Sequence, residues 1–341
     1  MRIMQVMGSD KRGGAENFFS RLCIALQKKT DITQCVIIRR NAPCMHDLLE
    51  GGVKPIEMPF FYSGNIISKL LLKKYINQFT PDIVLTWMSR ATSVCSKGSF
   101  IWVARFGGYY DLKYYKSCNH LIANTKEIID YLIKCGWLRE KTSYLPNFVD
   151  ENKSFSIDKA SLQTPSDAPV ILALGRFHSD KAFDVLINAM SKIPHAHLWL
   201  AGEGKLEYKL RAQTISLGIA ERVHFLGWRN DIGSLLVTAD CLVCPSRIEP
   251  LGNVILEGWF YKKPVVATTT TGPSGLIKNE KTGILVPSEK VSELAIAINR
   301  VITNPTLANR ISQLGHAYYI DNFSRDAVIN HYINFFKRMI Y

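Results

Sequence analysis

No uninterrupted apolar run in this sequence approaches 18 residues, the length expected of a membrane-spanning helix. The N-terminal residues 1–14 contain an apolar run of strand length in place of the apolar core of a signal peptide. We therefore expect a cytoplasmic protein. Of the 341 residues, 47% are apolar and 21% are charged, a balance typical of globular chains, and this length allows two domains of ordinary size.

Motifs for structural metal binding are also scarce. The eight cysteines are scattered and suggest no disulfide framework. One CxxC pair, Cys241 and Cys244, lacks the second CxxC or His pair of a zinc site. Its segment is typical of a buried strand, which places the two thiols on opposite faces. We therefore interpret these cysteines as small buried apolar residues rather than metal ligands.

Two further functional classes lack their sequence signatures. A dinucleotide-dependent oxidoreductase requires G-x-G-x-x-G after a strand, and neither residues 8–14 nor residues 201–207 have that spacing. A nucleic-acid-binding protein is suggested by the basic pI, but helix-turn-helix and zinc-finger spacings and an aromatic RNA-binding strand are missing from the sequence. We keep nucleic-acid binding as an alternative of a different class and expect no nucleic-acid partner.

Positive charge is unevenly distributed along the chain. The formal charge is +13, and residues 1–150 hold 21 Lys and Arg against 12 Asp and Glu, whereas the remainder hold 21 against 17. A first half this basic suits an anionic partner such as a membrane surface or a phosphorylated acceptor. A soluble basic surface without such a partner explains the excess equally well.

Strand-like apolar segments alternate with amphipathic helical patterns, which predicts parallel βαβ units. The alternation stops at the polar segment 150–169, the best candidate for a linker, and then restarts. We predict an α/β protein with two Rossmann-like, doubly wound parallel-sheet domains that face each other across a cleft. The expected parts are an N-terminal acceptor-binding domain (1–155), a C-terminal donor-binding domain (156–322) and a helix crossing back to the first domain (323–341).

Two cations follow the first predicted strand of the second domain. Gly175 ends that strand, and Arg176 and Lys181 lie in the loop and at the start of the next helix. Arginine offers a planar fork and lysine a mobile point charge, so the pair suits a diphosphate. Surface cations are common, however, and two of them alone are weak evidence.

The sequence RIEPLGNVILEGWF, residues 247–260, follows a later strand of the same domain and begins a helix. The free backbone N–H groups at the start of this helix are predicted to form an anion site, contributed by Leu251, Gly252 and Asn253.

Two carboxylates bracket this helix start. Glu257 lies about 9 Å along the axis from Leu251 at roughly 1.5 Å per residue, so it can contact a different part of an extended ligand from Glu249. Carboxylates accept hydrogen bonds from sugar hydroxyls. Taken singly, Glu249 is better explained as a capping acid and Glu257 as a solvated helix residue.

In this order, the segments 175–186, 200–210, 223–240, 248–268 and 281–287 resemble the retaining glycosyltransferases of family 4, which have the GT-B fold. The E-x7-E spacing from Glu249 to Glu257 is the signature of that family. The sequence GGAE at 13–16 is similar to its donor-side glycine loop. The resemblance covers nearly the whole chain.

This resemblance implies roles for the donor-binding residues. Arg176 and Lys181 match the basic pair that holds the donor diphosphate, and Glu249 matches the acid that contacts the hydroxyls of the donor sugar. Glu257 matches the acid that binds the ribose. The remaining matches are the phosphate loop of the first domain, Gly13 and Gly14, and the nucleobase pocket at 225–229, which includes Gly227 and Trp228.

The first domain departs from the family pattern. Many members carry a catalytic histidine in the region that matches residues 101–119, and this chain has none there. His120 opens a segment typical of a core strand, and we do not assign it a catalytic role. Either Arg105, Tyr109 or the adjacent glycine backbone serves on the acceptor side in its place, or this subgroup does without such a residue.

The acceptor region, residues 105–125, looks like that of the subgroup that extends lipopolysaccharide cores on lipid-linked acceptors at the inner face of the cytoplasmic membrane. Residues 66–79 alternate Ile and Leu with Lys69, Lys73 and Lys74, as in basic amphipathic helices that rest on anionic lipid. Peripheral membrane association is therefore a hypothesis, with an ordinary surface helix as the alternative.

The expected function is transfer of a hexose from a nucleoside-diphosphate-sugar, with UDP as the expected nucleotide, to a glycan or lipid-linked glycan hydroxyl. A nucleotide-sugar epimerase or a phosphorylase on the same fold is the alternative. The sequence contains no Asp-x-Asp motif, so we expect no cofactor and no obligatory metal ion.

Overall fold

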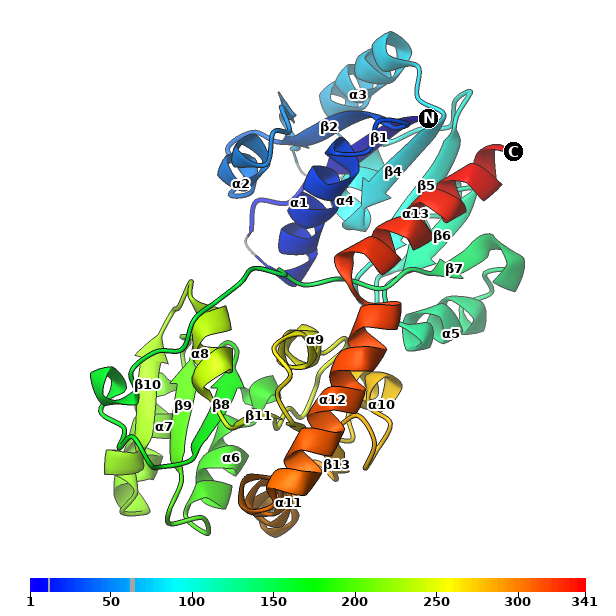
Figure 1. Cartoon of the computed structure of the whole chain (residues 1–341). Helices are drawn as coiled ribbons and strands as arrows, with labels where there is room; N and C mark the ends of the chain where they lie inside the picture. The colour runs from blue at the N-terminus through cyan, green and yellow to red at the C-terminus, as the bar shows by residue number, and fades with distance from the viewer. Residues whose placement is uncertain (12, 62–64) are drawn as a thin grey trace. The chain divides into compact units, whose positions relative to one another are not determined.

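The computed structural model describes residues 1–11, 13–61 and 65–341 and divides the chain into two compact units. Unit 1 comprises Met1–Phe148 together with Arg325–Tyr341, and unit 2 comprises Val149–Ser324 (Figure 1). The sequence placed these boundaries at 155/156 and 322/323. The first lies earlier because Val149 is buried in the core of unit 2 and Glu151 accepts a hydrogen bond of 2.8 Å from Tyr319.

Unit 1 contains a seven-stranded sheet in the order β3-β2-β1-β4-β5-β6-β7, in which every described pair is parallel. The strands are β1 (Arg2–Met7), β2 (Thr33–Arg39), β3 (Ile56–Met58), β4 (Ile83–Trp87), β5 (Ile101–Phe106), β6 (His120–Ala123) and β7 (Thr142–Tyr144). The inner strands are buried along almost their whole length because helices cover both faces of the sheet.

The helices of unit 1 form two layers. One core cluster joins the sheet to α1 (Gly14–Gln27), α2 (Met45–Glu50) and α13 (Arg325–Ile340). The opposite cluster joins it to α3 (Ile66–Phe79), α4 (Met88–Val94) and α5 (Lys126–Lys134). Side-chain caps define two of the helix starts: Asn65 accepts from the backbone of Ile67 and Ser68, and Thr125 accepts from Ile128.

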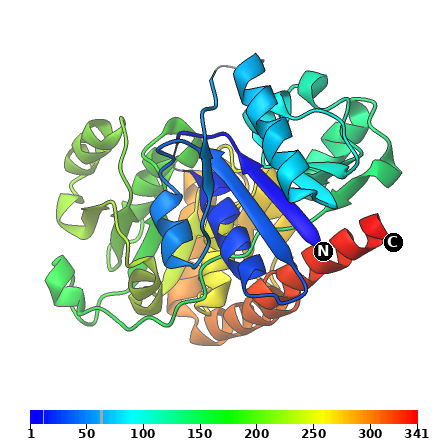
Figure 2. The same cartoon turned by 90° about the horizontal axis from the view of Figure 1, so that it is seen from above.

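The C-terminal helix α13 belongs to the core of unit 1. Val328, Tyr332 and Phe335 are buried against α1 and the sheet, and α13 lies beside α1 in Figures 1 and 2. Phe323, the first residue of the crossing helix predicted over 323–341, follows helix α12 (Pro305–Asn322) as its C-cap and is buried in unit 2. The helix predicted over 323–341 therefore does not include Phe323, because the chain passes there from the core of unit 2 to the core of unit 1.

Unit 2 contains a six-stranded parallel sheet in the order β10-β9-β8-β11-β12-β13. The strands are β8 (Val170–Leu174), β9 (His197–Ala201), β10 (Val223–Gly227), β11 (Cys241–Cys244), β12 (Val265–Thr268) and β13 (Ile284–Val286). One core cluster contains α6 (Phe183–Met190), α7 (Glu207–Ser216), α11 (Val291–Thr303) and part of α12 (Pro305–Asn322). The other contains α8 (Ile232–Thr238), α9 (Asn253–Phe260) and α10 (Thr271–Leu276).

Both sheets are doubly wound, as the alternation of the sequence predicted. In each, the order runs outward in two directions from the first strand, so β1 and β4 in unit 1, and β8 and β11 in unit 2, flank the point where the winding reverses. Ligands of open α/β sheets bind at the carboxyl ends of such strands. Cys241 and Cys244 in β11 lie in opposite core clusters, which confirms the prediction that they face opposite sides.

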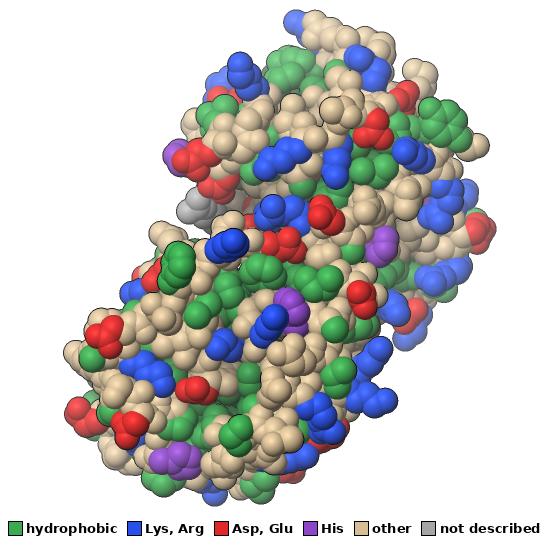
Figure 3. Space-filling view, viewed as in Figure 1, with side chains coloured by type: hydrophobic (Ala, Val, Ile, Leu, Met, Phe, Trp, Pro, Cys, Tyr) green, Lys and Arg blue, Asp and Glu red, His purple; other side chains and the backbone are tan. Residues whose placement is uncertain are grey.

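Among residues 1–11, 13–61 and 65–341, no helix combines the length and hydropathy needed to cross a membrane. On the face shown in Figure 3, Lys and Arg side chains are dispersed among acidic and apolar side chains rather than gathered into one patch.

Arg105, a candidate for acceptor binding, is buried at the end of β5 with 1% of its surface exposed. Its guanidinium donates to Tyr332 over 2.9 Å and to Asn147, and it stacks 4.6 Å from the ring centres of Phe18 and Trp87. Burying a guanidinium is favourable only when its donors are paired. Its contacts therefore give Arg105 a structural role in unit 1, which argues against the predicted contact with an acceptor.

The Tyr332→Phe variant should destabilise unit 1, because it leaves Nε of the buried Arg105 without its acceptor. Leaving a buried donor unpaired costs about 1–3 kcal/mol, and more when the donor is charged, which is measurable as a lower urea midpoint. Tyr75→Phe is a matched control, since no described residue forms a hydrogen bond with the Tyr75 hydroxyl. Equal midpoints for the two variants would contradict the structural role of this contact.

Candidate functional site

The sequence-predicted residues of unit 2 meet at the carboxyl ends of β8 and β11. These two strands are paired in parallel, so the loops that follow them lie at one edge of the sheet. Lys181 ends the short helix η4 (Ser179–Lys181) after β8, and Glu249 lies in the loop after β11. The Lys181 Nζ atom is 2.5 Å from Glu249 Oε2, although the two residues are 68 positions apart.

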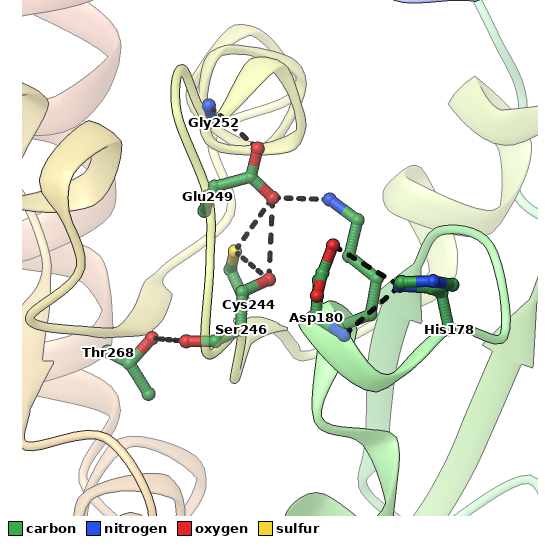
Figure 4. Close-up of polar contacts among 8 residues, drawn as sticks. His178, Asp180, Cys244, Ser246, Glu249, Gly252 and Thr268 are labelled. Carbon is green, nitrogen blue, oxygen red and sulfur yellow. Dashed lines mark hydrogen bonds and ion pairs between the residues drawn. The ribbon is translucent and has the colours of Figure 1, made fainter. Parts of the chain in front are cut away.

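The Glu249 carboxylate is held by donors on both oxygens (Figure 4). Oε2 accepts from Lys181 and from the Ser246 hydroxyl over 3.4 Å, and Oε1 accepts from the Gly252 backbone over 3.2 Å. Ser246 is itself fixed, because the Thr268 hydroxyl donates to its carbonyl over 2.6 Å. Only 10% of the Glu249 side chain is exposed, and such burial requires these partners.

The predicted anion site at the start of α9 differs from the prediction at Gly252. Gly252 is the N-cap of α9 with a φ of +82°, a conformation that glycine adopts without strain. Its N–H group donates to Glu249, so it is already occupied by a carboxylate of the same unit. For Leu251 and Asn253 the anion-binding role stays a prediction, as does the ribose-binding role of Glu257, which lies half-buried within α9.

Arg176 lies in the loop that follows β8 and is exposed. Among the residues that the structure describes, it makes no side-chain hydrogen bond or ion pair, so its guanidinium is available to an anion. Lys181 extends back over the same loop, because its aliphatic stem would lie 3.4 Å from a Cβ atom placed at Gly175. Both predicted diphosphate-binding cations thus share the loop region after β8.

The predicted base pocket lies at the end of β10. Gly227 has a φ of +66°, and the following Trp228 is 61% exposed. The Glu203 carboxylate, which the sequence did not single out, accepts from the Trp228 backbone over 3.2 Å. Glu203 follows β9 in the segment AGEGKLE. The two glycines of this segment are the feature of the sequence that could have indicated its place at the site.

A close approach of two backbones shapes the same edge of the sheet. Gly202 has a φ of +143°, and a Cβ atom there would lie 1.9 Å from the carbonyl oxygen of Gly175. A Cβ atom at Gly204 would lie 2.5 Å from the carbonyl oxygen of Phe177. Side chains at 202 and 204 would therefore push the loop that carries Arg176 and Lys181 away from β9.

Arg247 was also missed, although it stands two residues before Glu249. Its guanidinium forms a bidentate pair with Asp184 over 2.7 and 2.8 Å and also contacts Glu289. The hydrogen bonds that Arg247 donates to Asp184 raise the pKa of Arg247 above its ordinary value, against the effect of burial. Burial acts to raise the pKa of Asp184, but the hydrogen bonds and charge of Arg247, together with backbone hydrogen bonds, outweigh burial and leave that pKa below its ordinary value.

The candidates of unit 1 lie at the carboxyl edge of its own sheet. Gly13 is the N-cap of α1 and Gly14 is its first residue. Tyr109 follows β5, is 52% exposed and packs edge-on against Tyr131 with ring centres 5.2 Å apart. The roles predicted for Gly13, Gly14 and Tyr109 stay predictions.

His120 is buried in β6, which confirms its interpretation as a core residue. Its Nε2 atom lies 2.9 Å from the Ser143 hydroxyl, and its ring packs against Phe335. Burial, with a smaller contribution from Arg338, lowers the pKa of His120 to about 4.

No cluster of three or more His, Cys, Asp or Glu side chains placed to hold a metal ion occurs in the described part of the chain.

Comparison with known proteins gives one family match and several relatives. Residues 154–317 match the model of the family described as glycosyl transferases group 1. The lipopolysaccharide core biosynthesis glycosyltransferase LpsE of Rhizobium meliloti is 34% identical over 328 residues, covering 95% of each chain. LpsD of the same organism, with the same description, is 32% identical over 345 residues, covering 99% of this chain and 98% of LpsD.

Solved structures resemble the whole chain. A glycosyltransferase from Rickettsia africae superposes with a TM-score of 0.88 at 21% identity, covering 99% of this chain and 98% of the other. HepE from Anabaena in complex with UDP gives a TM-score of 0.86 at 20% identity, covering 99% of this chain and 100% of HepE. At these identities the likeness concerns the fold.

The Gly202→Ala variant should strongly destabilise unit 2, because its methyl group would overlap the carbonyl of Gly175. Left-handed strain and overpacking together predict a loss of about 2–5 kcal/mol in urea unfolding. Gly218→Ala is the matched control: its φ is +65°, but a Cβ atom there meets no neighbour within 4 Å. It should lose only about 1–2 kcal/mol. Similar losses for the two variants would show that the close approach carries no cost.

Proposed function

Because this chain belongs to the glycosyl transferases of group 1, with two parallel-sheet units of the GT-B fold, we propose that it is a retaining hexosyltransferase of cell-surface glycan synthesis. The proposed donor is a UDP-sugar. The proposed acceptor is a hydroxyl of a glycan or lipid-linked glycan, in the lipopolysaccharide core or another surface polysaccharide.

Two relatives and one structural neighbour support the finer parts of this proposal. LpsE and LpsD, which align with nearly the whole chain, are both described as lipopolysaccharide core biosynthesis enzymes. HepE has been crystallised with UDP, with UDP and glucose, and with UDP-glucose. These proteins support the class of acceptor and the donor nucleotide respectively.

The observation that carries the proposal is the convergence of Lys181, Glu249 and Arg176 on the carboxyl ends of β8 and β11. In the transfer, the bond between sugar C1 and the diphosphate oxygen breaks, and its electron pair stays on the leaving diphosphate. Arg176 and Lys181 would stabilise the charge that develops there. Glu249 would accept hydrogen bonds from the hydroxyls of the donor sugar.

We propose that the acceptor oxygen forms its bond to C1 on the face from which the diphosphate leaves. The acceptor proton would pass to the departing phosphate, so no side chain need act as a covalent nucleophile. This route requires neither a cofactor nor an obligatory metal ion, and retained activity in EDTA is the expected result. In the same scheme Glu257 binds the ribose, Gly227 and Trp228 contact the base, and Gly13 and Gly14 contact the phosphate.

A thermal-shift screen against UDP-, GDP- and ADP-sugars tests the donor, because a nucleotide that binds only the native state raises the melting temperature. We expect UDP and UDP-sugars to give the largest shift.

Lys181→Met should weaken binding of the UDP-sugar about 10–100-fold, as expected for losing a hydrogen bond to a charged group. Glu249→Gln should lower the transfer rate about 100-fold or more, since it alters contacts at the reacting sugar.

Glu293→Gln, an exposed acid on α11 of the same unit, is the control and should behave as the parent. Parent rates and affinities in both site variants would refute the assignment.

NMR of the glycosylated product reports the anomeric configuration, and an inverted product would refute retention. Isomerised donor without a glycosylated product would favour the epimerase, and a sugar phosphate the phosphorylase.

We also propose that α3 rests on an anionic membrane surface. Ile66, Ile67 and Leu70 are between 57% and 72% exposed at its N-terminal end. Lys69, Lys73 and Lys74 are exposed on the same helix, which contains no acidic residue. Exposed apolar side chains beside lysines suit the boundary between the head groups and acyl chains of anionic lipids.

Replacing Lys69, Lys73 and Lys74 with glutamine should reduce flotation with phosphatidylglycerol-containing vesicles at low salt. At about 1 kcal/mol per lysine, the partition coefficient should fall about 100-fold. Replacing Lys116, Lys134 and Lys141, exposed lysines elsewhere in unit 1, removes the same charge and should have a much smaller effect. Equal losses would indicate a general charge effect, and a parent protein that does not float would exclude this role of α3.

A further inference from the structure

We propose that Arg247 is a positioning residue that holds Lys181 and Glu249 in the geometry needed for transfer, an inference that rests on the proposed function of that site. The side chain does not itself contact the donor in this scheme. It acts through the two loops that carry the paired cation and carboxylate.

The guanidinium of Arg247 joins three parts of unit 2. Nη1 donates over 2.8 Å to the carbonyl of Ser179, the first residue of η4. The bidentate pair with Asp184 ties it to the first turn of α6. Nε and Nη2 contact Glu289, which lies in the turn before α11. All three guanidinium nitrogens are therefore bonded within the protein, which is why Arg247 is assigned to positioning and not to donor binding.

The backbone around Arg247 completes this connection. The N–H groups of Arg247 and Ile248 both donate to the carbonyl of Asp180, over 2.7 and 3.2 Å. Asp180 directly precedes Lys181, and Ile248 directly precedes Glu249. The loop after β11 is thus hydrogen-bonded to the loop after β8. The bond from Ile248 to Asp180 joins the residues that directly precede Glu249 and Lys181. Figure 4 shows Asp180 and Glu249 on the two loops that meet here.

Charge gives a second reason for an arginine at this position. Asp184 and Glu289 present two carboxylates to one guanidinium, so without Arg247 two like charges would face each other near η4. Their repulsion would displace η4 and add negative potential close to the loop proposed to bind a diphosphate. A lysine would supply the charge, but it cannot form the bidentate pair and the carbonyl bond together.

Displacement of catalytic groups by about 1 Å can cost a factor of about 100 in rate. We therefore expect Arg247→Met to lower kcat about 10–100-fold. It should weaken UDP binding, measured by calorimetry, less than Lys181→Met does, because the Lys181 cation is displaced and not removed. Arg247→Lys should recover only a small part of kcat. If Arg247 had a purely structural role, the variant would have a lower melting temperature, but its kcat would not fall by more than its affinity for UDP.

Arg300→Met is the matched control. Arg300 forms a bidentate pair with Glu280 over 2.7 and 2.8 Å in the same unit, between α11 and the turn before β13. Neither residue makes a described contact with residues 179–181 or 247–249. This variant should lose a comparable ion pair and keep the parent kcat.

Crystal structures of the parent and of Arg247→Met separate this inference from the proposed function, because they require no turnover. The inference predicts that the Lys181–Glu249 contact of 2.5 Å is lost or lengthened in the variant and retained in Arg300→Met. An unchanged contact in Arg247→Met, or a parent-like kcat in an active preparation, would overturn the positioning role. Absence of transfer and UDP binding in the parent would instead refute the proposed function, and the structures would still decide the role of Arg247.

Discussion

The parallel pairing of β8 with β11 is the constraint on which the candidate site depends. It places the loops after the two strands at one edge of the sheet, and so brings Lys181 to Glu249. The approach of Gly202 to the carbonyl of Gly175 allows the β8 loop to lie close to its other neighbour, β9. The strand order therefore brings the site residues together, and the glycines allow the loops that carry them to lie close to the neighbouring strand.

Electrostatic pairing keeps this edge of unit 2 stable before any anion arrives. Glu249 is neutralised by Lys181, and the two carboxylates around Arg247 share its guanidinium. Arg176 stands apart, since no described residue pairs with its side chain. In the proposed function, the diphosphate would meet Arg176 as an available cation and Lys181 as a cation already paired with a carboxylate.

Unit 1 shows the same use of buried charge for a structural purpose. Arg105 joins β5 to Asn147, beyond β7, and to Tyr332 on α13, while Phe18 and Trp87 cover its guanidinium. The last helix of the chain is therefore part of the first core. A basic residue beside a glycine pair at a strand end looks like a ligand-binding residue in the sequence. Burial, which the sequence does not display, gives it a different role.

Local patterns in the sequence were sufficient for the doubly wound class, because periodicity is a local property. The resemblance to a family, carried by motif spacing, proposed Lys181, Glu249 and Arg176 as site residues, and their roles stay predictions. Tertiary structure alone decided that Glu249 occupies the Gly252 N–H group, that Arg105 is buried and that Arg247 joins the two site loops. These contacts depend on which strands become neighbours and on which side chains the packing leaves exposed. Residues up to 227 positions apart meet in this way, and no local pattern records such a meeting.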